Sequence, residues 1–295
     1  ADNVDNSGKK KTGKTQYNRF RSRLFVNGEI NKNWKYTGML ENNRQMNNEK
    51  KEDITLNRAF LNGRIGGLKV EAGRCYFCQS DVTDERGDGI KVGYKFGKVN
   101  LTGWALKNYA AFSTDIAKNE YTSTKDSDRV YMVKADAKFG KLGAFAQFWK
   151  ADLTPAGTEI VEVGLTYPIA KGLALNAQYY NGRGEGAYDG GDKNGWEAGL
   201  KYLGAKASKP GSWGAWFTYS DRPVATFIHP SCLTTYGYKE KNWWTADDGY
   251  KGFEFGVNYA FAKNIVGTAR YLNYEGRENN KTECDTVWAE VVFTF

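Results

Sequence analysis

Three arginines spaced two residues apart carry the strongest chemical signal in this sequence. Arg19, Arg21 and Arg23 alternate with apolar or small residues. Successive side chains of a β-strand point to opposite faces, so the three guanidinium groups would share one face of a strand. The chemistry available to such a row is electrostatic, because the row sets the potential along the space that it lines.

The cysteines are the next candidates for chemistry. Cys75 and Cys78 have the spacing of a redox or metal motif, whereas Cys232 and Cys284 stand alone. A thioredoxin-like motif begins a helix, but this pair closes an expected strand. A zinc site made by all four is one alternative. Structural disulfides are favoured, because all four map to the side of the sheet with long connections, and three pairings are open.

Residues for enzymatic chemistry are scarce. His229 is the only histidine, and the sequence places no acid or nucleophile to pair with it on an expected strand. The chain has no P-loop and no dinucleotide-binding fingerprint. We therefore expect no enzyme activity, no cofactor and no metal site.

The elements that must position these residues are strands, because the dominant period of the sequence is two. For example, Ile90, Val92 and Tyr94 alternate with Lys91 and Gly93. The expected strands number about fifteen, and their length of about 8–12 residues is enough to cross a bilayer when tilted. They are 16–26, 34–42, 54–65, 68–78, 89–96, 99–109, 129–139, 142–150, 159–167, 173–180, 195–202, 213–220, 252–261, 265–274 and 286–295.

The composition narrows the class of protein. Aromatic residues make up 15% of the 295 residues, yet the mean hydropathy is −0.66. No apolar run approaches the roughly 20 residues of a transmembrane helix, and the many aromatic residues argue against disorder. The formal net charge is +8, but the basic residues are spread along the chain, which disfavours a nucleic-acid patch. A soluble all-β protein and a membrane β-barrel remain.

The connections between strands favour the barrel. Short connections alternate with long polar ones, as in outer-membrane barrels. A barrel of about fifteen strands is too wide for side chains to fill its interior, and barrels of that size enclose channels. We expect an all-β fold, a transmembrane antiparallel β-barrel of about 16 strands, over residues 16–295, with a flexible loop or tail at 1–15. The long connections are 43–53, 79–89, 110–128, 151–158, 181–194, 221–251 and 275–284.

The direction of the strands adds an expectation about the start of the barrel. Bacterial barrels have an even strand number and both ends on the periplasmic side. Counting back from the last strand makes 16–26 descend from the long-loop side. One strand is therefore expected before it, either upstream of residue 1 or formed irregularly by residues 1–13.

The last strand, 287–295 (VWAEVVFTF), resembles the terminal strand of bacterial outer-membrane proteins, and the whole pattern over 16–295 is similar to the general porins. The stretches 19–34 (RFRSRLFVNGEINKNW) and 56–63 (LNRAFLNG) resemble the porin domain of OmpM-type proteins of diderm Firmicutes. That family carries an S-layer-homology region and a coiled-coil stalk that bind the cell wall, and neither is visible in this sequence.

The resemblance implies a multi-pass protein of the outer membrane that forms a water-filled channel for passive diffusion of small hydrophilic solutes and ions. It also implies a homotrimer, and recognition of Phe295 by the barrel-assembly machinery. The alternative function is a structural barrel that tethers the outer membrane to peptidoglycan or another cell-wall polymer. Single-channel conductance separates the two functions.

Charged residues on the non-lipid faces are the expected pore lining, because a charge facing lipid costs roughly 2–4 kcal/mol at the midplane. The expected bases are Arg19, Arg21, Arg23, Lys35, Arg58, Arg64, Lys69, Lys134 and Arg270. The expected acids are Glu41, Glu71, Asp136, Glu162, Glu254 and Glu290.

The resemblance further implies that loop 79–89 folds into the lumen as the constriction. Its acids Asp81, Asp84, Glu85 and Asp88 would then face the arginine row. The plainer interpretation is a solvated acidic hairpin. Loop 110–128 is the second candidate for the constriction, because it is longer.

Overall fold

A computed structural model gives the fold of the chain. It describes residues 2–4, 10–12, 18–46, 54–80, 82–107, 114–115, 120–121, 129–152, 157–184, 192–228, 249–277 and 283–295. Within these ranges, no helix is long and apolar enough to cross a membrane.

Fifteen antiparallel strands form one sheet in which each strand pairs with the next along the chain. Between β8 and β11 the chain forms a separate small sheet of β9 (Thr114–Asp115) and β10 (Glu120–Tyr121). The strands of the large sheet are β3 (Arg19–Asn31), β4 (Trp34–Gln45), β5 (Thr55–Ile65), β6 (Leu68–Ser80), β7 (Thr83–Phe96), β8 (Val99–Lys107), β11 (Arg129–Phe139), β12 (Leu142–Asp152), β13 (Thr158–Ala170), β14 (Leu173–Gly184), β15 (Asn194–Leu203), β16 (Trp213–Arg222), β17 (Tyr250–Ala262), β18 (Ile265–Gly276) and β19 (Glu283–Phe293).

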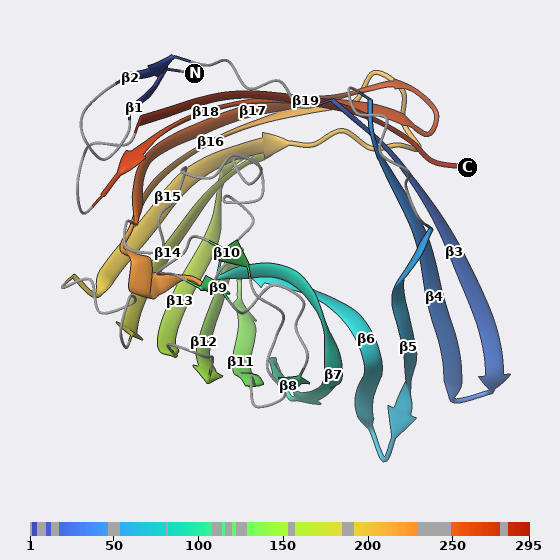
Figure 1. The fold of residues 1–295 in the computed structure, drawn as a ribbon. Helices are drawn as coiled ribbons and strands as arrows, with labels where there is room; N and C mark the ends of the chain where they lie inside the picture. Colours follow the sequence, from blue (N-terminus) through green and yellow to red (C-terminus); the bar gives the residue numbers. More distant parts are fainter. Residues whose placement is uncertain are drawn as a thin grey trace.

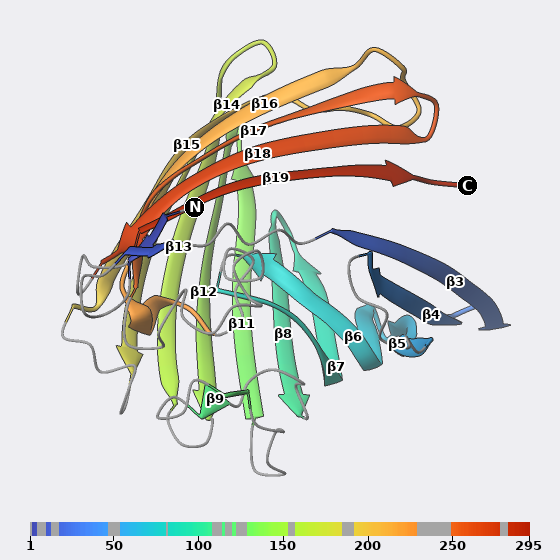
Figure 2. The ribbon, with the colours of Figure 1, turned by 45° about the horizontal axis from the view of Figure 1, so that its top comes forward.

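The sheet curls round on itself, and β3 and β19 are its edge strands (Figure 1). All fifteen segments expected as strands are strands of this sheet, so the all-β fold class is confirmed. Near the start, β1 (Asp2–Val4) pairs with β2 (Lys10–Thr12). Figure 2 shows this hairpin beside β19, which β1 contacts.

Tight turns connect the strands at one end of the sheet. Gly66 and Gly67 have φ angles of +53° and +88°, a left-handed pair that suits a two-residue hairpin. The connection expected at 27–33 is shorter than predicted, because β3 continues to Asn31 and β4 begins at Trp34. The bulge between Glu29 and Asn31 explains the difference, since it interrupts the alternation on which the prediction relied.

The polar face of the sheet is its inner face. On β13 the Glu162 side chain is 0% exposed, whereas its neighbours Val161 and Val163 are 44% and 43% exposed. This is the reverse of a soluble sheet, in which the apolar face is buried. Tyr179 follows the same rule and is exposed, but Tyr180 is buried. Adjacent residues of a strand point opposite ways, so Tyr179 lies on the outer face and Tyr180 on the inner face.

Candidate functional site: the barrel lumen

The arginine row lies on the inner face of β3, and the register of β3 with β4 gives it a carboxylate. Arg23 and Glu41 are direct partners in the register, and Arg23 Nε donates to Glu41 Oε2 at 2.6 Å. Asn57 Nδ2 donates to the other carboxylate oxygen at 3.2 Å. Arg21 is within electrostatic reach of Glu290 on β19. The row is thus part of a mixed-charge surface that spans both edge strands.

Further predicted lumen residues meet in pairs along β5 to β8. Lys91 Nζ lies 3.5 Å from Glu71 Oε2, and it also lies 5.8 Å from the centre of the Trp104 ring. The guanidinium of Arg58 lies 4.7 Å from the Tyr76 ring. Arg64 and Lys69 face each other in the register of β5 with β6. Lys35, near the turn after β3, faces Glu29.

The remaining predicted lumen residues lie on β11 to β19. Asn100 Nδ2 donates to Asp136 at 2.9 Å, and Lys134 Nζ lies 4.4 Å from the centre of the Phe145 ring. Gln147 donates to Glu162. Arg270 Nη1 lies 3.6 Å from Glu254. In these contacts each of the predicted charges lies next to an opposite charge, a side-chain amide or an aromatic ring.

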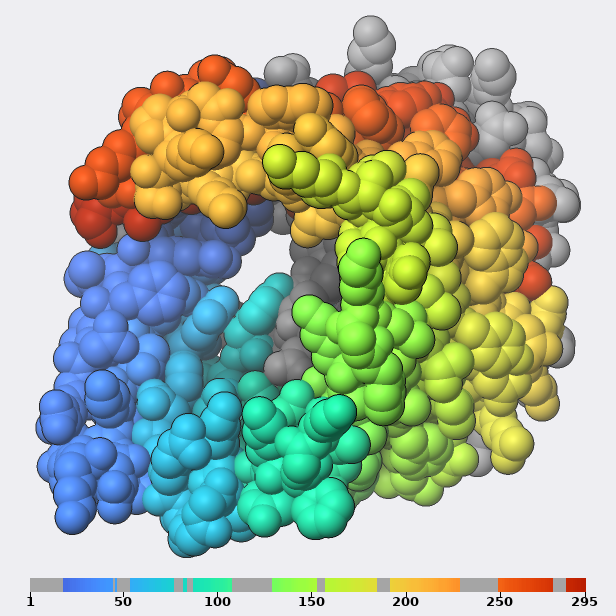
Figure 3. All heavy atoms as spheres, turned by 180° about the vertical axis from the view of Figure 1, so that it is seen from behind, coloured from blue at the N-terminus to red at the C-terminus, as the bar shows by residue number. Residues whose placement is uncertain are grey.

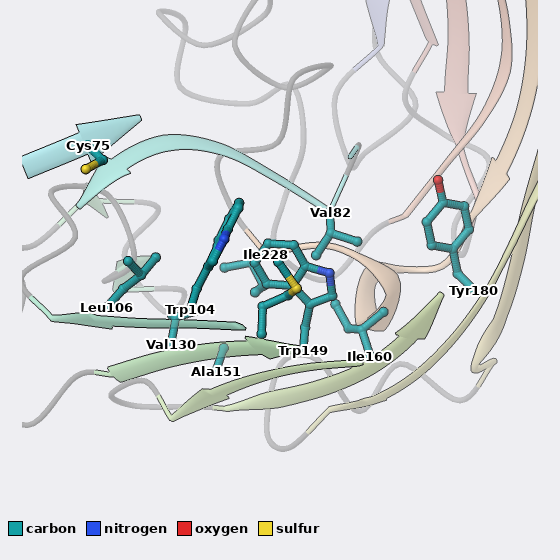
Figure 4. Packing of buried hydrophobic residues seen from close by; sticks show 11 residues of the cluster. Cys75, Val82, Trp104, Leu106, Val130, Trp149, Ala151, Ile160, Tyr180 and Ile228 are labelled. Atoms are coloured by element: carbon teal, nitrogen blue, oxygen red, sulfur yellow. The ribbon is translucent and has the colours of Figure 1, made fainter. Parts of the chain in front are cut away.

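The β6–β7 hairpin leaves the wall and enters the lumen. β6 pairs with β5 only as far as Arg74, and β7 pairs with β8 only from Asp88 onward. Among the described residues, no further strand pairs with the hairpin between these two residues. Val82 at its tip is 0% exposed. Figure 4 shows the hairpin arching from Cys75 to Val82, which lies above Trp149.

This hairpin corrects the expectation of a loop at 79–89. Strand structure continues to Ser80 and resumes at Thr83, and Asp88 is a strand residue rather than a loop acid. Asp88 forms a bidentate pair with Arg74, at 2.7 and 2.9 Å, at the base of the hairpin, and such pairs are strong and geometrically specific. Residue Asp81 and the side chains of Asp84 and Glu85 lie outside the described residues, as do most of loop 110–128 and His229.

Cys75 corrects part of the cysteine prediction. It is a free, buried thiol in an apolar cluster on the inner wall, so no disulfide involves it. The side chains of Cys78, Cys232 and Cys284 lie outside the described residues. The cluster itself was not predicted. It holds Val82, Trp104, Leu106, Val130, Met132, Trp149, Ala151, Ile160, Tyr180 and Ile228.

A second segment enters the lumen directly after β16. Residues 223–228 are all buried and include the short 3₁₀ helix η2 (Val224–Thr226). The Ile228 amide donates to the Val82 carbonyl at 2.7 Å, which joins this segment to the tip of the hairpin. Thr158 Oγ1 donates to the Ala225 carbonyl at 3.1 Å. This segment was not predicted from the sequence, although its apolar residues within the long connection 221–251 could have indicated a buried stretch.

A buried charge network holds this segment at its start. The Arg222 guanidinium lies 3.4 Å from the Tyr180 ring centre, and its Nη1 lies 3.3 Å from Glu197. Tyr180 and Ser220 donate to Glu197 at 2.6 and 2.9 Å. Arg222 Nε donates to Thr226 Oγ1 at 2.9 Å. Strands β14, β15 and β16 are thereby linked to η2.

Together the hairpin and the 223–228 segment narrow one side of the lumen. Figure 3 shows that the molecule is hollowed at its centre. Residues 78–207 match the Gram-negative porin family. Two mutants of the porin of Rhodopseudomonas blastica have TM-scores of 0.55 and 0.54, each at 15% identity, over 94% of this chain and 90% of theirs. A loop-deletion mutant of OmpT, an outer membrane protein of Vibrio cholerae, has a TM-score of 0.56 at 13% identity, over 93% of this chain and 90% of its own.

The fold is a porin barrel. No curated protein matches the chain in sequence. The family match of residues 78–207 points to a channel protein rather than an enzyme.

The porin barrel requires glycine at residue 182, because the 223–228 segment packs closely against the inner face of β14 there. A Cβ at Gly182 would lie 2.1 Å from the Ala225 carbonyl oxygen. Gly182→Val is therefore expected to displace the segment at a cost of about 1–3 kcal/mol and to increase single-channel conductance. Gly28→Val is the matched control, because nothing lies within 4 Å of a Cβ there. Equal conductance in both variants would contradict the obstruction of the lumen by this segment.

A charge clamp at the long-loop rim of the porin barrel joins the start of β15 and the ends of β16 and β18. Arg277 Nη2 donates to Asp192 at 2.6 Å, and Arg277 Nε donates to Asp221. Two hydrogen bonds lower the pKa of Asp192. The one from Arg277 has the larger effect, and the one from the Asn194 amide has the next largest. The stabilisation that Asp192 provides is therefore complete above its ordinary pKa and is lost only as the pH falls through the lowered value.

Arg277→Met is expected to raise the pKa of Asp192 toward its ordinary value, because the largest lowering cause is removed. Carboxyl ¹³C NMR titration of Asp192 measures this change. Lys251→Met is the control, since it removes the ion pair of Lys251 with Glu275 at 3.1 Å and leaves the clamp intact. An unchanged titration in Arg277→Met would show that the clamp does not form.

Proposed function

We propose that the protein is an outer-membrane porin, a water-filled channel for passive diffusion of small hydrophilic solutes and ions. The observation that carries the proposal is the inverted β13 pattern, with Glu162 buried inside and Val161 and Val163 exposed outside. A curled sheet with this pattern presents an apolar surface to lipid and a charged surface to water. The porin-barrel fold and the match of residues 78–207 support it.

Planar-bilayer recordings test this proposal. The purified protein is expected to produce discrete, ohmic conductance steps in potassium chloride. A protein that inserts in the bilayer but never conducts would overturn the channel proposal and favour the alternative of a structural barrel that tethers the outer membrane to the cell wall. The excess of basic residues on the chain supports a weak anion preference, which a salt-gradient reversal potential would show.

The partners of the channel are proposals of the same kind. The proposed homotrimer is supported by small residues on the outer face, where Ala135 faces Ala146 and Ala137 faces Ala144 across β11 and β12. Analytical ultracentrifugation in detergent would give the oligomeric state. Recognition by the barrel-assembly machinery is proposed for Phe295, which is fully exposed. A relationship to OmpM-type proteins, with a wall-binding region, is proposed from the resemblance of 19–34 and 56–63.

A further inference from the structure

A row of side chains on the inner wall, which we name the tryptophan–arginine row, crosses β16 to β19. Trp216 is the register partner of Gly256, Gly256 of Arg270, and Arg270 of Trp288. The row consists of Trp216, Arg270 and Trp288, with Gly256 between the first two. Since register partners lie side by side, the three side chains form a line across the strands.

Gly256 makes the row flat. A Cβ at residue 256 would lie 2.1 Å from Cζ2 of Trp216, so the indole ring lies directly over the glycine. The Arg270 guanidinium continues the surface, with its Cζ 5.9 Å from the Trp216 ring centre and 4.6 Å from the Trp288 ring centre. Both tryptophans are only partly buried. The wall therefore presents two aromatic surfaces with a planar cation between them.

Glu254 supplies hydrogen-bonding capacity beside the row. It accepts from Trp216 Nε1 at 2.7 Å, and its carboxylate lies 3.6 Å from Arg270. The two opposite charges offset each other, so the pair does not select strongly for ions. A guanidinium and a carboxylate side by side supply donors and acceptors for a hydroxylated ligand.

We propose that this row is a weak binding site for sugar rings that pass through the lumen, and the inference rests on the proposed channel function. A sugar ring has one face of C–H bonds and a rim of hydroxyl groups. The electron-rich faces of Trp216 and Trp288 suit the C–H face, and Arg270 with Glu254 suits the hydroxyl rim. Binding along a channel wall must stay weak enough to permit release.

The test measures block of ion current through the reconstituted wild-type channel by maltotriose. The current is expected to fall with maltotriose concentration and to saturate in the millimolar range. Polyethylene glycol of the same hydrodynamic radius is expected to reduce the current without saturation, because it lacks a ring to stack. Saturable block by both molecules alike, or by neither, would overturn the sugar site.

Variants separate the row from general features of the pore. Trp288→Leu retains an apolar side chain but removes the flat ring, and the half-saturating maltotriose concentration is expected to rise about tenfold. Trp216→Leu is a second, independent variant with the same expected direction. Trp196→Leu is the control, because Trp196 lies on the outer face and is 45% exposed. An ohmic channel whose maltotriose block is equal in all variants would refute the row while leaving the channel function intact.

Discussion

Replacing Glu197 with leucine is expected to lower the free energy of unfolding by about 3–5 kcal/mol, because it leaves a buried guanidinium without its carboxylate. The Arg222 and Glu197 side chains are 0% and 4% exposed, so water cannot take the place of the missing partner. Tyr180 and Ser220 would lose the same acceptor. Urea unfolding in detergent micelles, followed by tryptophan fluorescence, measures the change.

The matched control is Glu159→Leu. Glu159 also pairs with a base, Lys150, at 3.3 Å, but both side chains are more than 40% exposed. Its loss is expected to cost less than about 1 kcal/mol. The double variant Glu197→Leu with Arg222→Met should recover most of the stability, because an apolar pair can replace a buried ion pair. Equal losses for Glu197→Leu and Glu159→Leu would show that the buried network does not anchor the 223–228 segment.

Reversing the arginine row, with Arg19, Arg21 and Arg23 all changed to Glu, is expected to shift the channel toward cations. The interaction energy between a unit charge and an ion about 5 Å away is about 0.8 kcal/mol in water. Reversing the sign of that charge therefore changes the energy of a passing ion by about twice this amount. The anion-to-cation permeability ratio should fall by about tenfold or more. The reversal potential in a salt gradient measures it, and high salt should weaken the effect.

The control for this variant reverses three lysines in the tight turns, Lys98, Lys141 and Lys171. The change in net charge is the same, but these residues lie outside the strands that line the lumen. Its reversal potential should stay close to that of the wild type. A matching shift in both variants would mean that net charge, rather than the row on β3, sets selectivity. Within the row, Arg23 should contribute least, because Glu41 already offsets its charge.

The sequence by itself determined the strands and the face on which each side chain lies. Alternation needs only neighbouring residues, and it placed Arg23, Glu41, Glu162 and Arg270 on the polar face without any knowledge of the fold. Charge cannot face lipid at low cost, so the choice of the inner face for these residues followed as well. Prediction failed locally where a bulge interrupts the alternation, as between Glu29 and Asn31.

Only the tertiary structure decided which charges meet and what enters the lumen. Strand register determines the pairing of Arg23 with Glu41 and the alignment of Trp216, Arg270 and Trp288. Alternation does not determine the register, because a shift of two residues keeps every side chain on the same face. The hydrogen bond of Ile228 to Val82 and the stacking of Arg222 on Tyr180 join segments far apart in the chain. Such contacts form only after the sheet has curled and brought those segments to the same side of the lumen, so no local pattern encodes them.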